Sequence, residues 1–389
     1  MPMKTSSIKK PKTNQAIALL ATAFMLGGMA GTAIGDPSQM PPATEQIGGV
    51  GNAPDTVTGH YGKVDYEYQI GTYEVTNAQY VAFLNAVKDS NPDDPLGRGP
   101  LGLYHNGMKD MNNNGIVLNG STHKYEVTYG FNDKPVTSVT VYAAMRFVNW
   151  LTNGAMDGAS TETGVYTLLG GTAIPTNPTV ERNVTFNGET LTGTGALADY
   201  TGTVWALPSE DEWYKAAYYN VSNGSYSLYP NGKNDIDETE ANYAFQAESP
   251  APDGGDLNGT MDVNSYQPNP NGLYNMAGNV IEWTDTRVTF WSGQNISEHN
   301  ARALRGGSFN YISGALSSSG RLYGSNADSD ISSDNYNFDT GFRVVLLSIT
   351  AVPASVPEPG TYAALAGLVA LLACVAVRRH RHIRDVRRN

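Results

Sequence analysis

Cysteine is the residue whose distribution most constrains this chain. The single cysteine, Cys374, lies in an apolar run near the C-terminus. The body of the chain therefore has no intramolecular disulfide, no thiolate metal site and no cysteine nucleophile. The six histidines show neither the HxxH nor the HExxH spacing that would indicate a zinc or iron site. Any fold of the body must do without covalent cross-links and without these metal motifs.

Charge is distributed unevenly along the 389 residues. The first 35 residues hold four lysines and no acid, whereas residues 378–389 hold six arginines and one aspartate. The segment between them has 15 Lys and Arg against 36 Asp and Glu, a net charge of −21. Such an acidic body repels nucleic acid, because binding there depends on Lys and Arg replacing counterions. The sequence therefore predicts no nucleic-acid partner, and it is compatible with divalent cations.

The N-terminus has the composition of an export signal. Four lysines precede the apolar run AIALLATAFMLGGMAGTAIG, which ends in small residues before Asp36. This order predicts a secretory signal peptide over residues 1–35, cut by signal peptidase after Gly35. The alternative is an uncleaved membrane anchor. Residues 36–61, which are rich in Pro, Gly and Thr, are expected to form a linker.

The C-terminus also has the features of a targeting segment. Residues 351–389 combine Pro357-Glu358-Pro359, an apolar run over 361–377 and an arginine cluster. The run is just long enough to span a bilayer as a helix, with the arginines on the cytoplasmic side. The combination resembles the PEP-CTERM sorting signal of bacterial exported proteins. That resemblance implies transient inner-membrane anchoring, recognition by an exosortase, and release to the cell surface or exopolysaccharide matrix. A plain C-terminal anchor is the alternative.

Local patterns in the body predict few regular elements. DYEYQI (65–70) alternates as a strand does. Capping boxes at Thr76 and Ser209 predict helices that begin there, and the apolar spacing over 141–151 predicts another helix. The apolar run 341–349 is typical of a strand. The remainder is rich in Gly, Asn and Asp, and residues 155–203 form a polar insertion with no recognisable chemistry.

Four segments in order carry a family resemblance: YEVTNAQYVAFLNAV, WALPSEDEWYKAAY, GLYNMAGNVIEW and LRGGSFNYI with GFRV. Together they resemble the formylglycine-generating enzyme, or sulfatase-modifying factor, family across nearly all of the body. The resemblance implies one domain over 62–350 with an irregular α+β fold related to the C-type lectin fold. Such a fold has few helices and little regular secondary structure, which agrees with the local patterns.

The segment GLYNMAGNVIEW suggests a structural calcium site. Calcium is bound by several carboxylate, amide and carbonyl oxygens, and a glycine lets the chain bend so that they converge. By family analogy Asn275 and Glu282 supply side chains while Gly278 and Val280 supply carbonyls. The alternative is a cation-free turn in which Glu282 pairs with an arginine such as Arg305. A second family site would map to Asn242, the Tyr243 carbonyl and Asp256.

The same resemblance implies a catalytic centre whose metal-binding residues are missing from this sequence. In the enzymatic members two cysteines after the RGGS motif bind copper and activate oxygen. Tyr311 and Leu316 occupy those positions here, and the histidine cluster of the related iron-dependent members is also missing. No copper or iron is therefore expected. Ser308 remains, but no histidine pairs with it in a recognisable pattern, so it is not a candidate nucleophile.

Three functions follow as hypotheses. The first is a non-catalytic, calcium-stabilised module that binds an unknown peptide or glycan through a groove around Trp283, Ser308, Tyr311, Leu316 and Arg321. The second is an enzyme of the same superfamily with unrecognised chemistry. The third is a purely structural matrix protein without a specific ligand.

Overall fold

The computed structural model describes most of the body of the chain. The described residues are 36–58, 61–89, 99–109, 115–177, 180–182, 202–243, 259–292, 295–324 and 338–349. The predicted signal peptide and the predicted sorting signal with its helix at 361–377 lie outside these ranges. Among the helices within them, none is long and apolar enough to cross a membrane.

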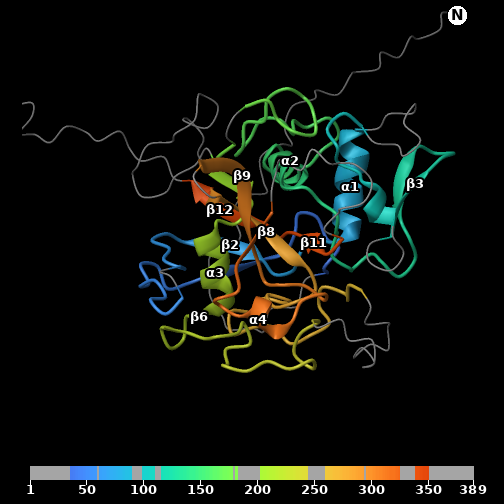
Figure 1. The fold of residues 1–389 in the computed structure, drawn as a ribbon. Helices are drawn as coiled ribbons and strands as arrows, with labels where there is room; N and C mark the ends of the chain where they lie inside the picture. The colour runs from blue at the N-terminus through green and yellow to red at the C-terminus, as the bar shows by residue number, and fades with distance from the viewer. Residues whose placement is uncertain are drawn as a thin grey trace, which may run out of the picture. The chain divides into compact units, whose positions relative to one another are not determined.

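The fold is a mixed α+β arrangement in which short elements are joined by irregular chain (Figure 1). The helices are α1 (Asn77–Val87), the 3-10 helix η1 (Asn106–Lys109), α2 (Val141–Thr152), α3 (Glu210–Tyr218) and α4 (Ser313–Leu316). The strands are β1 (Thr44–Ile47), β2 (Tyr68–Gly71), β3 (Ile116–Asn119), β4 (Lys124–Val127), β5 (Gly202–Ala206), β6 (Tyr219–Asn220), β7 (Ser225–Tyr226), β8 (Ile281–Ser292), β9 (Asn295–Arg305), β10 (Leu322–Gly324), β11 (Thr340–Gly341) and β12 (Val345–Ile349). This low content of regular structure confirms the predicted fold class.

Two of the helices begin at the predicted capping boxes. The Thr76 side chain accepts the backbone N–H of Gln79, whose side chain accepts the backbone N–H of Thr76 in return. Ser209 and Glu212 make the same reciprocal pair at the start of α3. Each box satisfies two of the N–H groups that a helix start leaves unpaired, so these ends are determined within one turn of chain.

The core of the fold is centred on an aromatic cluster that joins α1 and α2. Phe147 of α2 is fully buried, and its ring centroid lies 5.4 Å from those of Phe83 and Phe342. The rings of Tyr80 and Trp150 lie 6.1 and 5.8 Å from it. Burying each such ring contributes about 1.5–3 kcal/mol. The cluster holds both helices against the segment that leads into β12.

The first sheet includes residues that had been expected to form a linker. Its strand order is β1-β2-β12-β5 with antiparallel neighbours, and β1 pairs with β2 from Thr44 opposite Gly71 to Ile47 opposite Tyr68. Part of the segment 36–61 is therefore an edge strand of the sheet. The Pro and Gly content of the segment gave no indication of this four-residue strand, which pairs with β2.

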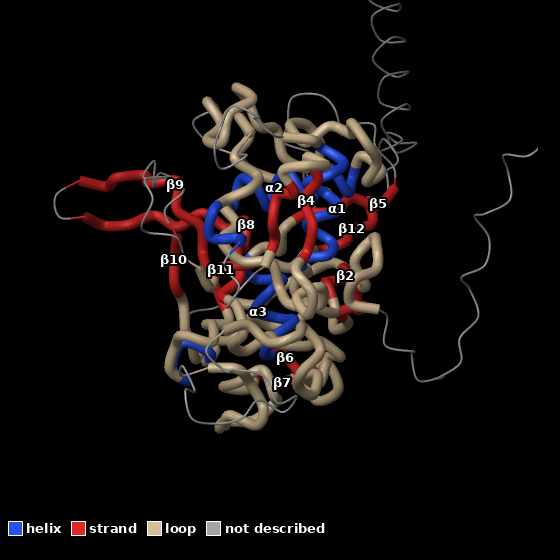
Figure 2. The backbone as a smooth tube through the Cα atoms, turned by 90° about the vertical axis from the view of Figure 1, so that its right-hand side faces the viewer, coloured by secondary structure: helices blue, strands red, loops and turns tan. Residues whose placement is uncertain are grey.

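The second sheet is built on a long hairpin that the local patterns did not predict. Its order is β10-β9-β8-β11, with β11 parallel to β8 and the other neighbours antiparallel. Figure 2 shows β8 and β9 extending together beyond the base of this sheet. The predicted strand over 341–349 is divided between the two sheets, because Thr340–Gly341 pairs with β8 and Val345–Ile349 pairs with β2 and β5.

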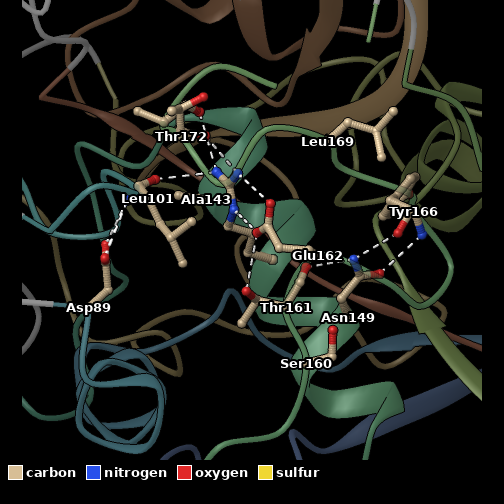
Figure 3. Close-up of polar contacts among 12 residues, drawn as sticks. Asp89, Leu101, Ala143, Asn149, Ser160, Thr161, Glu162, Tyr166, Leu169 and Thr172 are labelled. Atoms are coloured by element: carbon tan, nitrogen blue, oxygen red, sulfur yellow. Dashed lines mark hydrogen bonds and ion pairs between the residues drawn. The ribbon is translucent and has the colours of Figure 1, made fainter. Parts of the chain in front are cut away.

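The described part of the predicted insertion is fastened to α2 by buried polar contacts (Figure 3). Arg146 is fully buried, and its guanidinium donates to both carboxylate oxygens of Glu162 and to the carbonyl of Thr172. The Asn149 amide donates to the carbonyls of Thr161 and Tyr166. Residues 155–177 thus cover α2 as an integral part of the fold.

Candidate functional site

The chain that leads into β8 has an unusual backbone conformation. Asn275, Gly278 and Asn279 have left-handed φ values of 49°, 74° and 58°. A Cβ atom on Gly278 would lie 2.1 Å from the carbonyl oxygen of Asn242, so this position requires glycine. The Asn279 N–H donates to that same carbonyl at 2.8 Å. The two segments predicted to bind calcium therefore meet in space.

Glu282, a predicted calcium ligand, is fully buried in a close ion pair. Its carboxylate accepts two hydrogen bonds from the Arg343 guanidinium, both at 2.7 Å, and one from the Trp213 indole N–H at 2.8 Å. The alternative expectation had named Arg305 as a partner, but Arg343 takes this place. Both oxygens of Glu282 are thus occupied by protein donors.

A second buried carboxylate, Glu74, lies beside this pair. Its Oε1 accepts from the Asn279 amide at 2.9 Å, and its Oε2 accepts from the Asn275 amide at 3.3 Å. Burial raises the pKa of Glu74 to about 8; Arg343 opposes the rise and Glu282 adds to it. Two carboxylates and one guanidinium therefore share one buried cluster. Sequence analysis missed Glu74, although it lies within the quoted segment YEVTN.

The cluster contains one feature that fits a cation. The Oδ1 atom of Asn275 is buried and has no hydrogen-bond partner, as expected for an amide oxygen that serves as a metal ligand. Glu282 fits less directly, because a calcium ion there would take an oxygen from Arg343 or Trp213. Within the described ranges no three His, Cys, Asp or Glu side chains gather as ligands, so such a site would rely on amide and carbonyl oxygens.

The residues of the second predicted calcium site make protein contacts or lie outside the described ranges. The Asn242 amide donates to the Gly259 carbonyl and to Oδ1 of Asn279. The Tyr243 hydroxyl donates to the carbonyl of Ile236. Asp256 is not among the described residues.

The residues predicted to line a ligand groove are mostly enclosed. Ser308 is fully buried and donates to Asp339 at 2.5 Å, while the Trp283 indole donates to the Val139 carbonyl at 2.8 Å. Leu316 is also fully buried, whereas Tyr311 is half-buried. Of these four side chains, Tyr311 alone is positioned to contact a ligand at the surface.

Arg321, the fifth predicted groove residue, belongs to an ion-pair cluster around Glu210. Arg321 binds both oxygens of Glu210 at 2.7 and 2.8 Å, and Arg305 binds Oε1 at 2.8 Å. Burial opposes the charged form of Glu210, but the hydrogen bond from Arg321 and the charge of Arg305 outweigh it and lower its pKa. The Tyr61 ring lies under both guanidinium groups. Arg305, the first residue of the RGGS motif, and Arg321 therefore both bind the first residue of α3.

The surface next to Tyr311 is apolar. Ile312 follows Tyr311 directly and is 75% exposed. Phe338 is 40% exposed, and its ring centroid lies 5.9 Å from that of Phe309. Aromatic and aliphatic side chains that remain exposed beside one another are candidates for ligand contact.

Comparisons with known proteins place this arrangement in a family. The serine/threonine-protein kinase pkn1 of Chlamydia pneumoniae is 38% identical over 116 residues, which are 30% of this chain and 15% of that protein. The formylglycine-generating enzyme of Thermomonospora curvata is 33% identical over 125 residues, 27% of this chain and 39% of that enzyme. This chain thus spans well under half the length of either relative.

A family description covers most of the chain. The crystal structure of CarF is similar over 80% of this chain and 99% of CarF, with 20% identity and a TM-score of 0.48. The sulfatase-modifying factor enzyme 1-like domain matches residues 41–347, which include every residue discussed in this section. The chain therefore belongs to the sulfatase-modifying factor enzyme 1-like domain family.

Proposed function

We propose that this chain is an exported, non-catalytic member of its family that binds a peptide or glycan at the cell surface or in the exopolysaccharide matrix. The observation that supports this most strongly is the pair of residues at the positions of the family's copper-binding cysteines. Tyr311 and Leu316 supply no thiolate, and Cys374 is the chain's one cysteine. Leu316 instead packs against Ala241, Tyr243 and Ala277. The proposal of export is based on the two terminal segments, which signal peptidase and an exosortase would process.

The ligand surface that we propose is formed by Tyr311, Ile312 and Phe338. Aromatic rings stack on sugar rings and on peptide side chains, and a partly exposed tyrosine offers its hydroxyl as well. The Tyr311 N–H donates to the Ser308 carbonyl and Phe338 precedes Asp339 in the chain, so both lie beside the enclosed Ser308–Asp339 contact. The family's reaction site would then have kept a recognition surface without its metal ligands.

The proposal is tested by two assays on the purified chain. With copper, oxygen and a cysteine-containing peptide, we expect no conversion of cysteine to formylglycine by mass spectrometry. On peptide and glycan arrays we expect a reproducible ligand, and the Ile312→Ser/Phe338→Ala double variant should weaken its binding about tenfold or more, roughly 1.4 kcal/mol. Tyr129→Ser, which alters a residue that is 98% exposed elsewhere, is the control. Oxygen-dependent turnover, or arrays without any binder, would contradict the proposal.

We further propose that one calcium ion stabilises the domain, with ligands from Asn275, Gly278, Val280 and Glu282. The buried, unpartnered Oδ1 of Asn275 supports this assignment. The weaker second site would use Asn242, Tyr243 and Asp256. The ion would hold together the irregular chain between 242 and 282, which contains no regular element in its described part apart from the start of β8.

Calcium is expected to raise the melting temperature of the purified chain relative to chelator. At a hundredfold its dissociation constant, mass action contributes about 2.7 kcal/mol to the free energy of unfolding. Asn275→Ala should remove this difference, whereas Asn119→Ala, in the β3–β4 turn, should keep it. Equal melting temperatures of the unaltered chain in calcium and in chelator would contradict the proposed calcium site.

A further inference from the structure

Two arginines face each other on the long hairpin. Arg287 of β8 and Arg302 of β9 are cross-strand partners in the register, and directly paired residues lie on the same face of a sheet. Arg302 is 2% exposed, while the Arg287 side chain is 29% exposed. Two positive charges therefore lie side by side, one enclosed and the other reaching solvent.

The enclosed guanidinium has no carboxylate partner in the described part of the chain. The two terminal nitrogens of Arg302 donate to the backbone carbonyls of Asp285 and Val180. Its Nε–H is buried and unpartnered. The Asp285 carboxylate is already bound by the Arg182 guanidinium at 2.7 Å and by the Tyr166 hydroxyl at 2.8 Å. The charge of Asp285 still acts on Arg302, because Arg182 is also bound by both oxygens of Glu212. The buried Nε–H of Arg302 is nevertheless an unsatisfied donor, which is costly, so this arrangement favours an added acceptor such as an anion.

The neighbouring Arg287 also has a free donor. Its Nε–H is buried and has no partner among the described residues, and its NH1 meets Glu181, a side chain that is 66% exposed, at 3.3 Å. Such an exposed pair contributes little. Arg287 thus offers a second guanidinium N–H beside that of Arg302.

The hydroxyl of Tyr142 completes the surroundings. Tyr142 is the second residue of α2, close to the helix N-terminus, where anions are favoured. Burial raises the Tyr142 pKa, and the charges of Arg302, Arg146 and Arg287 oppose that rise. Burial lowers the pKa of Arg302; the charge of Asp285 opposes this, and the charge of Arg287 adds a smaller lowering. At Tyr142 the nearby arginine charges favour a negative group.

We propose that Arg287 and Arg302, beside the N-terminus of α2, bind an oxyanion: a sulfate, phosphate or carboxylate group. The two unpartnered Nε–H groups donate to its oxygens, as guanidinium groups do when they bind such anions. Because Arg302 is enclosed and Arg287 reaches solvent, the anion enters along Arg287. This site is separate from the proposed ligand surface and does not depend on it.

The test compares melting temperatures of the purified chain in sodium sulfate, phosphate, glucuronate and chloride at equal ionic strength. At about 10 mM, one oxyanion should raise the melting temperature by about 3 °C or more above chloride. The most effective salt identifies the group. In Arg287→Gln calorimetry should show at least tenfold weaker binding. Lys88→Gln, which alters a cation whose side chain is 70% exposed, should bind as the unaltered chain does.

A second variant addresses the enclosed charge. Arg302→Met should lose the oxyanion response entirely, because it removes the enclosed N–H donor. If Arg302→Met does not fold, Arg287→Gln still tests the proposal. The proposal is overturned if no oxyanion exceeds chloride, or if Arg287→Gln and Lys88→Gln respond equally.

Discussion

Replacing Arg343 by methionine is expected to lower the free energy of unfolding by about 3–5 kcal/mol. Arg343 is fully buried and donates to both oxygens of Glu282, as well as to the carbonyls of Gly71 and Tyr274. Without it, Glu282 and the nearby Glu74 would be two buried carboxylates with no cation. Chemical denaturation monitored by tryptophan fluorescence measures the change, since Trp213 contacts Glu282.

Two controls separate charge from geometry at this pair. Arg343→Lys keeps the positive charge but loses the paired hydrogen bonds, so it should cost less than Arg343→Met. The double variant Arg343→Met/Glu282→Leu removes both charges and should recover part of the loss. If Arg343→Met changed the free energy of unfolding by less than about 1 kcal/mol, the pair would not be holding this cluster together.

The contribution of Lys215 to stability is expected to rise between pH 8 and pH 10, while buried tyrosines such as Tyr104 and Tyr218, whose pKa values burial raises, act in the opposite direction. Lys215 of α3 is fully buried; its ammonium donates to the Gly49 carbonyl at 2.8 Å and lies 6.0 Å from the ring centroids of Tyr68 and Tyr219. Burial lowers its pKa to about 8. In this window the unfolded chain therefore binds more protons at this position than the folded chain, so the contribution of Lys215 to stability grows as the pH rises. The gain should be about 1–2 kcal/mol.

The comparison with Lys215→Met isolates this contribution. The variant has no titrating group at the site, so the free energy of unfolding of the unaltered chain should gain about 1–2 kcal/mol relative to that of the variant between pH 8 and pH 10. Lys88→Met, which alters a side chain that is 70% exposed, should follow the unaltered chain. Denaturation curves at pH 7, 8, 9 and 10 provide the measurement. Parallel pH profiles for the unaltered chain and Lys215→Met would show that the ammonium does not titrate in this range.

The elements predicted from sequence are those whose signals are local. The boxes at Thr76 and Ser209 were recognisable because donor and acceptor lie three residues apart, and α2 was recognisable from its apolar spacing. Strands β1, β8 and β9 were not predicted. A strand forms its hydrogen bonds with another segment of the chain, and the sequence of the strand alone does not identify that segment. The prediction from composition differs most from the structure at residues 36–61. The Pro and Gly content indicated a linker, whereas the structure has the edge strand β1 there.

Sequence by itself determined that the body of the chain offers no thiolate. A thiolate requires cysteine, and the single cysteine is Cys374, so residue identity decides this without coordinates. The tertiary structure decided which charges meet. Glu282 pairs with Arg343, 61 residues away, and Glu74 meets Asn279 across 205 residues. Any buried carboxylate favours any nearby guanidinium or amide, and only the path of the folded chain selects the partner that lies within hydrogen-bond distance.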